Sequence, residues 1–197
     1  MGHGRQTTYR KSGKLGDVSP RPIRPDLAWR LLVVRDTTHY GFPTWDSACV
    51  RLANWVRLRN VESGTDFHFI NTHLDHVSQE AREQQARLIV EDSAAYPGTY
   101  PQLMTGDMNC AGDNAAIDCF RNGGWQDSHS AIHGADNPDT FHRFRGTDYD
   151  GTLGKIDWMF SRGQVTAITS QIVRQERDGR YMSDHDFIWA DVALTAR

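Results

Sequence analysis

The chain has 197 residues, of which 38% are hydrophobic, and a formal net charge of −3. This length fits one large domain or two small ones, and without a run of about 18 apolar residues no membrane-spanning helix is expected. Residues 1–20 lack the apolar segment of a secretory signal, and the three cysteines share no zinc spacing and leave one thiol over in any disulfide scheme. We therefore expect a cytoplasmic protein with one domain over residues 1–197, loop-rich at 1–26.

Charge is unevenly distributed along the chain. Residues 1–60 contain eleven Lys and Arg against four acidic residues, all Asp, which gives this part +7 and leaves −10 for the remainder. A basic segment beside an acidic one could serve a phosphate-bearing ligand held by a carboxylate-bound cation. A solvated basic face explains the same distribution equally well.

Strand and loop patterns alternate in the first third of the chain. Residues 1–26 are rich in Gly, Pro, Ser and Arg, and their prolines forbid a helix. Apolar and β-branched stretches then predict three strands, in the second of which Val56 and Leu58 face one way and the arginines the other. A hairpin turn at residues 62–65 separates the second strand from the third. The three strands are predicted at residues 27–35, 49–59 and 66–74.

Helices and strands are mixed in the rest of the chain. Ser78 is the predicted N-cap of a helix over residues 79–93, and Asp113 that of a second helix ended by Gly123. A loop-rich stretch precedes Gly154. Further strands are predicted at residues 102–105, 155–160, 165–173 and 187–194. Because no repeat is present, the pattern indicates one α/β or α+β layered domain.

Polar side chains lie inside or at the ends of four of these apolar strands. Active sites of open α/β layers gather at strand ends, because rigid strands place the side chains while loops stay adaptable. A single Gly-Asp after a strand is more often a turn, but a carboxylate inside a strand needs a partner. The residues concerned are His73, Asp107, Asn109, Asp157, Asp184 and His185.

The order of these clusters carries a family resemblance. The chain reads NTHLDH at residues 71–76, TGDMN at 105–109, TFH at 140–142, KIDWMF at 155–160 and SDHDFIWADV at 183–192. In this order and spacing the motifs resemble those of the endonuclease/exonuclease/phosphatase superfamily of metal-dependent phosphoesterases. The resemblance implies an α/β fold, a layered β-sandwich with flanking helices.

The resemblance also implies the chemistry, a metal-assisted attack of water on phosphorus. A phosphoester is negatively charged, so its site must neutralise it and aim a water in line. By analogy, Asp107 orients or deprotonates the water, and Asn109 holds the water and a phosphate oxygen. His185 donates to phosphoryl oxygens while Asp157 fixes its ring. His73 contacts the phosphate or assists the leaving oxygen.

The same resemblance implies a metal site. Asp184 and Asp107 are the expected ligands, with Mg²⁺ favoured and Mn²⁺ the alternative, because their carboxylate oxygens are hard ligands. His142 is a further candidate for contact with the substrate, although Thr140 and Phe141 beside it are at least as well explained by a structural role. Asp75 and His76, which follow His73 in the chain, are interpreted as the turn that leads into the predicted helix.

The chain also departs from the family pattern. Members normally carry a site Asn on a first strand and a metal-binding Glu, usually after Gln, on a second, and neither motif occurs in these 197 residues, whose first Glu is Glu62. The fold is therefore expected to be incomplete at its N-terminal side. Two readings follow: a Mg²⁺-dependent phosphoesterase, most simply nuclease-like, or a catalytically impaired phosphate-binding or interaction module. Nucleic acid, lipid and inositol phosphates remain alternative substrates.

Overall fold

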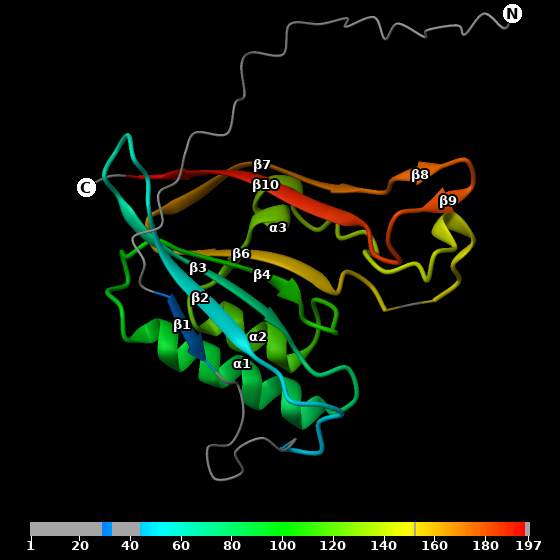
Figure 1. The fold of residues 1–197 in the computed structure, drawn as a ribbon, viewed down its shortest axis with the longest axis horizontal. Helices are drawn as coiled ribbons and strands as arrows, with labels where there is room; N and C mark the ends of the chain where they lie inside the picture. Colours follow the sequence, from blue (N-terminus) through cyan, green and yellow to red (C-terminus); the bar gives the residue numbers. More distant parts are fainter. Residues whose placement is uncertain (1–28, 33–43, 152, 196–197) are drawn as a thin grey trace, which may run out of the picture.

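A mixed β-sheet forms the centre of the computed structural model, which describes residues 29–32 (backbone only), 44–151 and 153–195 (Figure 1). The predicted loop at residues 1–26 lies outside the described residues. The sheet has six strands, and β3 pairs in parallel with β4 while its other pairs are antiparallel. Their order is β1 (Trp29–Leu32), β2 (Ala53–Arg59), β3 (Asp66–His73), β4 (Gln102–Asp107), β6 (Asp157–Arg162) and β5 (Gln126–Asp127).

Helix α1 (Gln79–Ala94) connects the two parallel strands, as a parallel pair requires a crossover. The predicted N-cap is confirmed: Ser78 is in an extended conformation and its hydroxyl accepts a hydrogen bond from the amide of Ala81. The helix buries Ala86 and Ile89 against the sheet. It thereby places the end of β3 beside the end of β4.

Helix α2 (Ala115–Asn122) lies beside α1 on the same side of the sheet (Figure 1). Its predicted inward residues, Ala116, Ile117 and Phe120, are fully buried. The predicted cap is wrong by one residue, because the side chain of Asn114 accepts the amide of Ala116 and no such bond involves Asp113. Both residue types cap helices well, so the sequence alone does not separate them.

A second, smaller sheet covers the face of the central sheet opposite to α1 and α2 (Figure 1). It has two antiparallel strands in the described part of the chain, so the predicted layered α/β architecture is present with a reduced second sheet. The elements of this layer and its far end are α3 (Ser128–His133), a 3₁₀ turn η1 (Gly146–Asp148), β7 (Val165–Val173), β8 (Glu176–Arg177), β9 (Arg180–Tyr181) and β10 (Phe187–Leu194).

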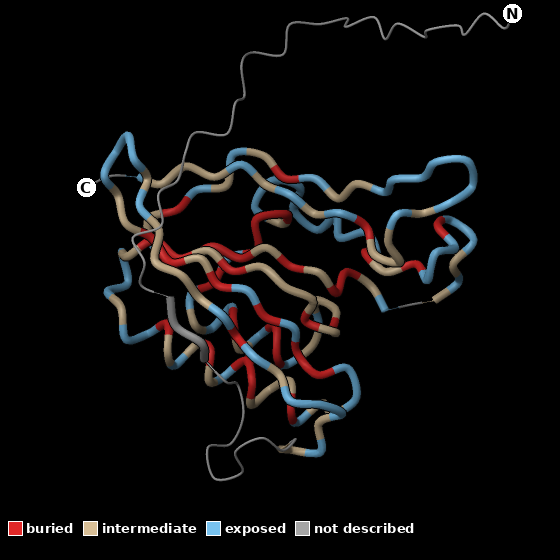
Figure 2. Tube along the Cα trace, in the orientation of Figure 1, coloured by how far each residue is buried: buried red, intermediate tan, exposed pale blue. Residues whose placement is uncertain are grey.

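The hydrophobic core lies between the central sheet and the two helices. Buried segments gather there, while much of β7 and β10 is exposed or half-buried (Figure 2). Among the described residues, Ile168 and Phe187 are exposed members of the small sheet. None of the described helices is both long and apolar enough to cross a membrane.

Two local features were not predicted from the sequence. The core face of β3 carries His68, Ile70 and Thr72, all buried, and Ile70 pairs with Trp55. Both faces of this sheet are covered, so alternation does not mark the core side. The stretch before Gly154 is also not all loop, since α3 forms there with its amides capped by the carboxylate of Asp127.

Candidate functional site

Three of the predicted site residues lie in one row across three adjacent strands. His73 ends β3, Asp107 ends β4, and the two are register partners in the parallel pair. Asp157 begins β6 and is the antiparallel partner of Asp107. Gly106 permits the close approach of β3 and β4 at this point, because a Cβ there would lie 2.1 Å from the carbonyl oxygen of Thr72. Sheet register therefore brings the three side chains together.

His185 joins this row from the chain segment before β10. Its backbone forms an isolated antiparallel bridge with Phe141, flanked by hydrogen bonds from His142 N to Asp184 O and from Asp186 N to Thr140 O. Its Nδ1 lies 2.8 Å from Oδ2 of Asp157. These backbone contacts place the imidazole of His185 beside the carboxylate of Asp157, which was predicted to orient it.

The carboxylate of Asp107 lies between two imidazoles. Its Oδ2 is 3.4 Å from Nε2 of His73 and 4.0 Å from Nε2 of His185. Its Oδ1 accepts the backbone amide of Asn109 at 2.8 Å. The predicted meeting of distant side chains therefore occurs, with Asp107 at its centre.

The two imidazoles have opposite electrostatic environments. The hydrogen bond that the Asp157 carboxylate accepts from His185, helped by the charges of Asp157 and Asp107, raises the pKa of His185. Burial, assisted by the charge of Arg51, lowers the pKa of His73, even though Asp107 acts in the other direction. These opposite pKa shifts favour the protonated form of His185 and the neutral form of His73.

Burial also raises the pKa of the Asp107 carboxyl, and the charge of Asp157 acts in the same direction. Hydrogen bonding by the Asn109 amide and the charges of the two imidazoles oppose this rise. A carboxylate that is made more basic by its surroundings is suited to accept a proton from water.

Asn109 shapes the loop that follows β4. Its φ of 50° is in the left-handed region, which Asn tolerates better than most residues. Its Nδ2 donates to the carbonyl oxygen of Leu74 at 2.9 Å, so the side chain ties the loop to the end of β3. This bond uses one N–H of Nδ2, so the second N–H and the side-chain oxygen of Asn109 are left for a water or a ligand.

Thr140 links the two parts of the site, which agrees with the structural role expected for it. Its buried hydroxyl accepts the amides of Ile156 and Asp157 at 3.0 and 3.1 Å, and its carbonyl accepts the amide of Asp186. One residue therefore fixes both the start of β6 and the segment that carries His185.

His142 lies behind the site rather than at its surface. Its side chain is 2% exposed, its Nε2 is 3.5 Å from Oδ1 of Asp186, and its Nδ1 accepts the amide of Gly146. Burial speaks against the predicted contact with substrate, and these bonds give His142 a supporting role instead.

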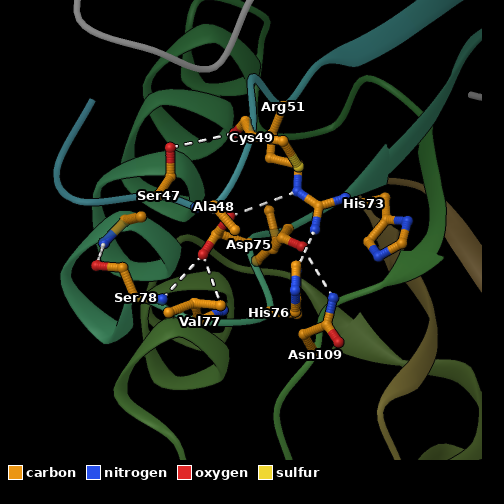
Figure 3. Close-up of polar contacts among 12 residues, drawn as sticks. Ser47, Ala48, Cys49, Arg51, His73, Asp75, His76, Val77, Ser78 and Asn109 are labelled. Atoms are coloured by element: carbon orange, nitrogen blue, oxygen red, sulfur yellow. Dashed lines mark hydrogen bonds and ion pairs between the residues drawn. The ribbon is translucent and has the colours of Figure 1, made fainter. Parts of the chain in front are cut away.

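Asp75 and His76 border the site without joining the row. The buried carboxylate of Asp75 accepts the amides of Ala48, Val77 and Ser78, as the helix-entry reading predicted (Figure 3). His76 lies 2.9 Å through Nδ1 from Nη2 of Arg51. The guanidinium of Arg51, a residue that no sequence motif singled out, lies beside Asp75 and is turned toward His73 (Figure 3).

Comparison with known proteins gives results at the level of structure. No protein-family model matches the chain, and a comparison with curated proteins finds no match. An endonuclease/exonuclease/phosphatase from Bacteroides vulgatus is 28% identical with a TM-score of 0.76, over 88% of this chain and 67% of its own. A mannosyl-6-phosphatase from Bacteroides thetaiotaomicron is 23% identical with a TM-score of 0.72, over 87% and 67%. TDP2 from D. rerio, complexed with single-strand DNA product, is 16% identical with a TM-score of 0.65, over 87% and 68%.

Solved structures similar to this chain include several endonuclease/exonuclease/phosphatase proteins. The resemblance drawn from the five motifs is confirmed, and with it the phosphoesterase fold of the family. The chain spans about two thirds of the length of the structures compared.

A group of side chains that could hold a metal ion accompanies the endonuclease/exonuclease/phosphatase fold. Ligand atoms of Asp107, Asp157 and His185 lie within 4.8 Å of one another. Asp184, the other predicted ligand, is not part of this group, although its charge reaches His185 and helps to raise its pKa. Asp107 is common to the predicted and the observed sets, and Asp184 stays a prediction.

Proposed function

We propose that the chain hydrolyses phosphoester bonds by in-line attack of water, assisted by a divalent cation. The convergence of Asp107, Asp157 and His185 within 4.8 Å carries this proposal. A base, a charged donor and oxygen ligands for a cation are what attack on a negatively charged phosphorus requires.

In this reaction Asp107, His185 and Asp157 have different roles. Asp107 orients the attacking water and takes its proton, and the water oxygen bonds to phosphorus as the bond to the leaving oxygen breaks. The charged His185 donates a hydrogen bond to a phosphoryl oxygen as negative charge develops there. Asp157 holds that imidazole in place, as the bond of 2.8 Å between them supports.

Two further residues complete this assignment. The neutral His73 contacts the phosphate or assists the leaving oxygen. Asn109 accepts a hydrogen bond from the water through its side-chain oxygen, and the N–H of its Nδ2 that Leu74 does not engage donates to a phosphate oxygen.

The donor set fits Mg²⁺, with Mn²⁺ as the alternative. Asp107 and Asp157 bring two carboxylates close together. Burial, with the charge of Asp157, raises the pKa of Asp107, and a bound cation would stabilise its ionised form. Asp107 and Asp184 would hold the ion. When bound, it supplies positive charge to the phosphoryl oxygens.

A nuclease-like substrate is the favoured choice. The net charge of +7 in residues 1–60 suits a polyanion, and the TDP2 structure contains a DNA product. The relative that is a mannosyl-6-phosphatase keeps a phosphomonoester as an alternative. A phosphate-binding module without turnover is the second candidate function, supported by the missing Gln-Glu motif.

Release of p-nitrophenol from bis-p-nitrophenyl phosphate and from p-nitrophenyl phosphate, with Mg²⁺ or with EDTA, tests the proposal. We expect Mg²⁺-dependent release that Asp107→Ala and His185→Ala each reduce at least about 100-fold. Asp178→Ala, at an exposed carboxylate in the β8–β9 hairpin, is the matched control. Equal rates in wild type and both site variants would refute the assigned roles, and phosphate binding without turnover would favour the second candidate.

A further inference from the structure

Arg51 brings a permanent positive charge to the His73 side of the site, although the proposed reaction assigns it no role. It precedes β2, and its side chain is 11% exposed. Figure 3 shows its guanidinium between Asp75 and His73, with one side turned toward the imidazole.

The contacts of Arg51 leave some N–H donors of its guanidinium without a hydrogen bond. Nη2 is 2.9 Å from Nδ1 of His76, while Nε is 3.7 Å from Oδ2 of Asp75 and is buried without a hydrogen-bond partner among the described residues. A guanidinium has five N–H donors, and buried donors without a partner are costly. These two contacts therefore leave donors available to a ligand.

Asp75 does not need Arg51 to satisfy its hydrogen bonds. Its carboxylate already accepts three backbone amides, those of Ala48, Val77 and Ser78, and these bonds help to lower its pKa. The purely structural reading, in which Arg51 serves only to neutralise Asp75, accounts for the ion pair but not for the side turned toward His73. Both readings are compared in the test below.

A phosphoryl group is the ligand that this arrangement suits. Row residues Asp107 and Asp157 are acidic, so a phosphate there needs positive charge from its surroundings. A guanidinium presents paired N–H groups that match the oxygens of a phosphate, and it stays charged at any working pH. The imidazole of His73, half-exposed beside it, can add a further contact.

We propose that Arg51 binds a non-bridging phosphoryl oxygen on the His73 side of the row, opposite the oxygen that receives the hydrogen bond from His185. The phosphoryl group is then held from two sides, with Asp107 between them. This assignment rests on the proposed function for its substrate, but it also makes inorganic phosphate a ligand of the protein whether or not turnover occurs.

Calorimetric titration of inorganic phosphate into the full chain tests the assignment without a catalytic readout. Wild type is compared with Arg51→Gln, Arg51→Lys and the control Arg177→Gln, whose arginine is 91% exposed. We expect Arg51→Gln to raise the Kd for phosphate at least about tenfold, since a hydrogen bond to a charged group is lost. Arg51→Lys gives a smaller rise, and Arg177→Gln stays within about twofold of wild type.

Arg51→Lys keeps a positive charge near Asp75, so it provides the answer even if Arg51→Gln fails to fold. Unchanged phosphate affinity in both Arg51 variants, or no phosphate binding by wild type, would overturn the assignment. A loss of thermal stability in Arg51→Gln with unchanged phosphate affinity would establish the structural reading.

Asp107→Asn separates this inference from the proposed function. The variant loses turnover if the proposed chemistry is right, yet it binds phosphate at least as tightly as wild type, because a like charge has been removed. Arg51-dependent phosphate binding without any turnover would support the inference and refute the hydrolase. Turnover that depends on Asp107 but not on Arg51, with phosphate affinity unchanged in the Arg51 variants, would support the hydrolase and refute the inference about Arg51.

Discussion

Asp157 and His185 are joined by a hydrogen bond of 2.8 Å between Oδ2 and Nδ1, across 28 residues of sequence. An ionised carboxylate only accepts hydrogen bonds, so Nδ1 carries the proton and Nε2 is the atom that faces Asp107, 4.0 Å away. The bond fixes the ring and raises its pKa at once. The proposed use of His185 as a charged donor follows from this one contact.

Replacing Asp157 by Asn tests that dependence. Because the raised pKa keeps the imidazolium present below it, activity that needs this form is lost as pH rises through the pKa of His185. Asp157→Asn lowers that pKa, so the basic limb of the pH profile of kcat moves to lower pH, and kcat at pH 8 falls roughly 10- to 100-fold. Asp178→Asn leaves the profile unchanged. An unshifted basic limb in Asp157→Asn would show that His185 is not the acidic group.

Metal titration of site variants distinguishes the predicted ligand pair, Asp107 and Asp184, from the group of Asp107, Asp157 and His185. Titration of Mn²⁺ followed by calorimetry should show at least about tenfold weaker binding in Asp107→Asn, because a charged oxygen ligand is lost. Asp184→Asn should weaken binding to a similar degree if the predicted pair holds the ion. Wild-type affinity in Asp184→Asn together with weak binding in Asp157→Asn would assign the ion to the group of Asp107, Asp157 and His185.

Much of the site could be predicted because its residues end or begin strands that alternate clearly. His73, Asp107 and Asp157 follow from strand patterns, and sheet register then makes them neighbours. The delivery of His185 could not be predicted in this way, since it depends on a bridge to Phe141 between segments without a strand signal. The family motifs supplied that link.

The features that sequence reasoning missed depend on distant partners or on very short elements. Arg51 has no local signal, and its place near His73 arises from contacts with Asp75 and His76 more than 20 residues away. Helix α3 spans six residues, too few for a periodic pattern, and its cap, Asp127, belongs to the two-residue strand β5. The two-residue strands of the β8–β9 hairpin are equally short.

Thr140→Val should reduce both stability and activity. The change removes a buried oxygen that accepts two amides, and leaving these unsatisfied costs about 1–3 kcal/mol in the free energy of unfolding. Urea unfolding measures this cost. Thr140→Ser keeps the oxygen, so it should lose less stability and retain more activity. Equal losses in the two variants would contradict the role of the hydroxyl in linking the two parts of the site.

His68 should make the fold sensitive to acid. It is buried on β3 with its ring stacked on Trp55 at 4.4 Å, and burial, assisted by the charge of Arg57, lowers its pKa to about 4. The unfolded chain takes up the proton near pH 6.5, so stability is full above that value. It then declines by up to about 1.4 kcal/mol per pH unit as pH falls toward 4.

Urea unfolding of wild type and His68→Phe between pH 7 and pH 4 measures this decline. The variant lacks the titrating group, so its free energy of unfolding should fall less steeply over that range. The same slope in both proteins would place the acid sensitivity elsewhere in the chain.

A double-mutant cycle on Asp107 and His185 tests the central claim, that these side chains act on one phosphoryl group. The rate of Mg²⁺-dependent phosphodiester hydrolysis is measured for wild type, Asp107→Asn, His185→Gln and the double variant. Groups that act as a unit are not additive, so the double variant should be about as slow as the slower single variant. Rate losses that multiply in the double variant, or single variants as fast as wild type, would contradict the claim.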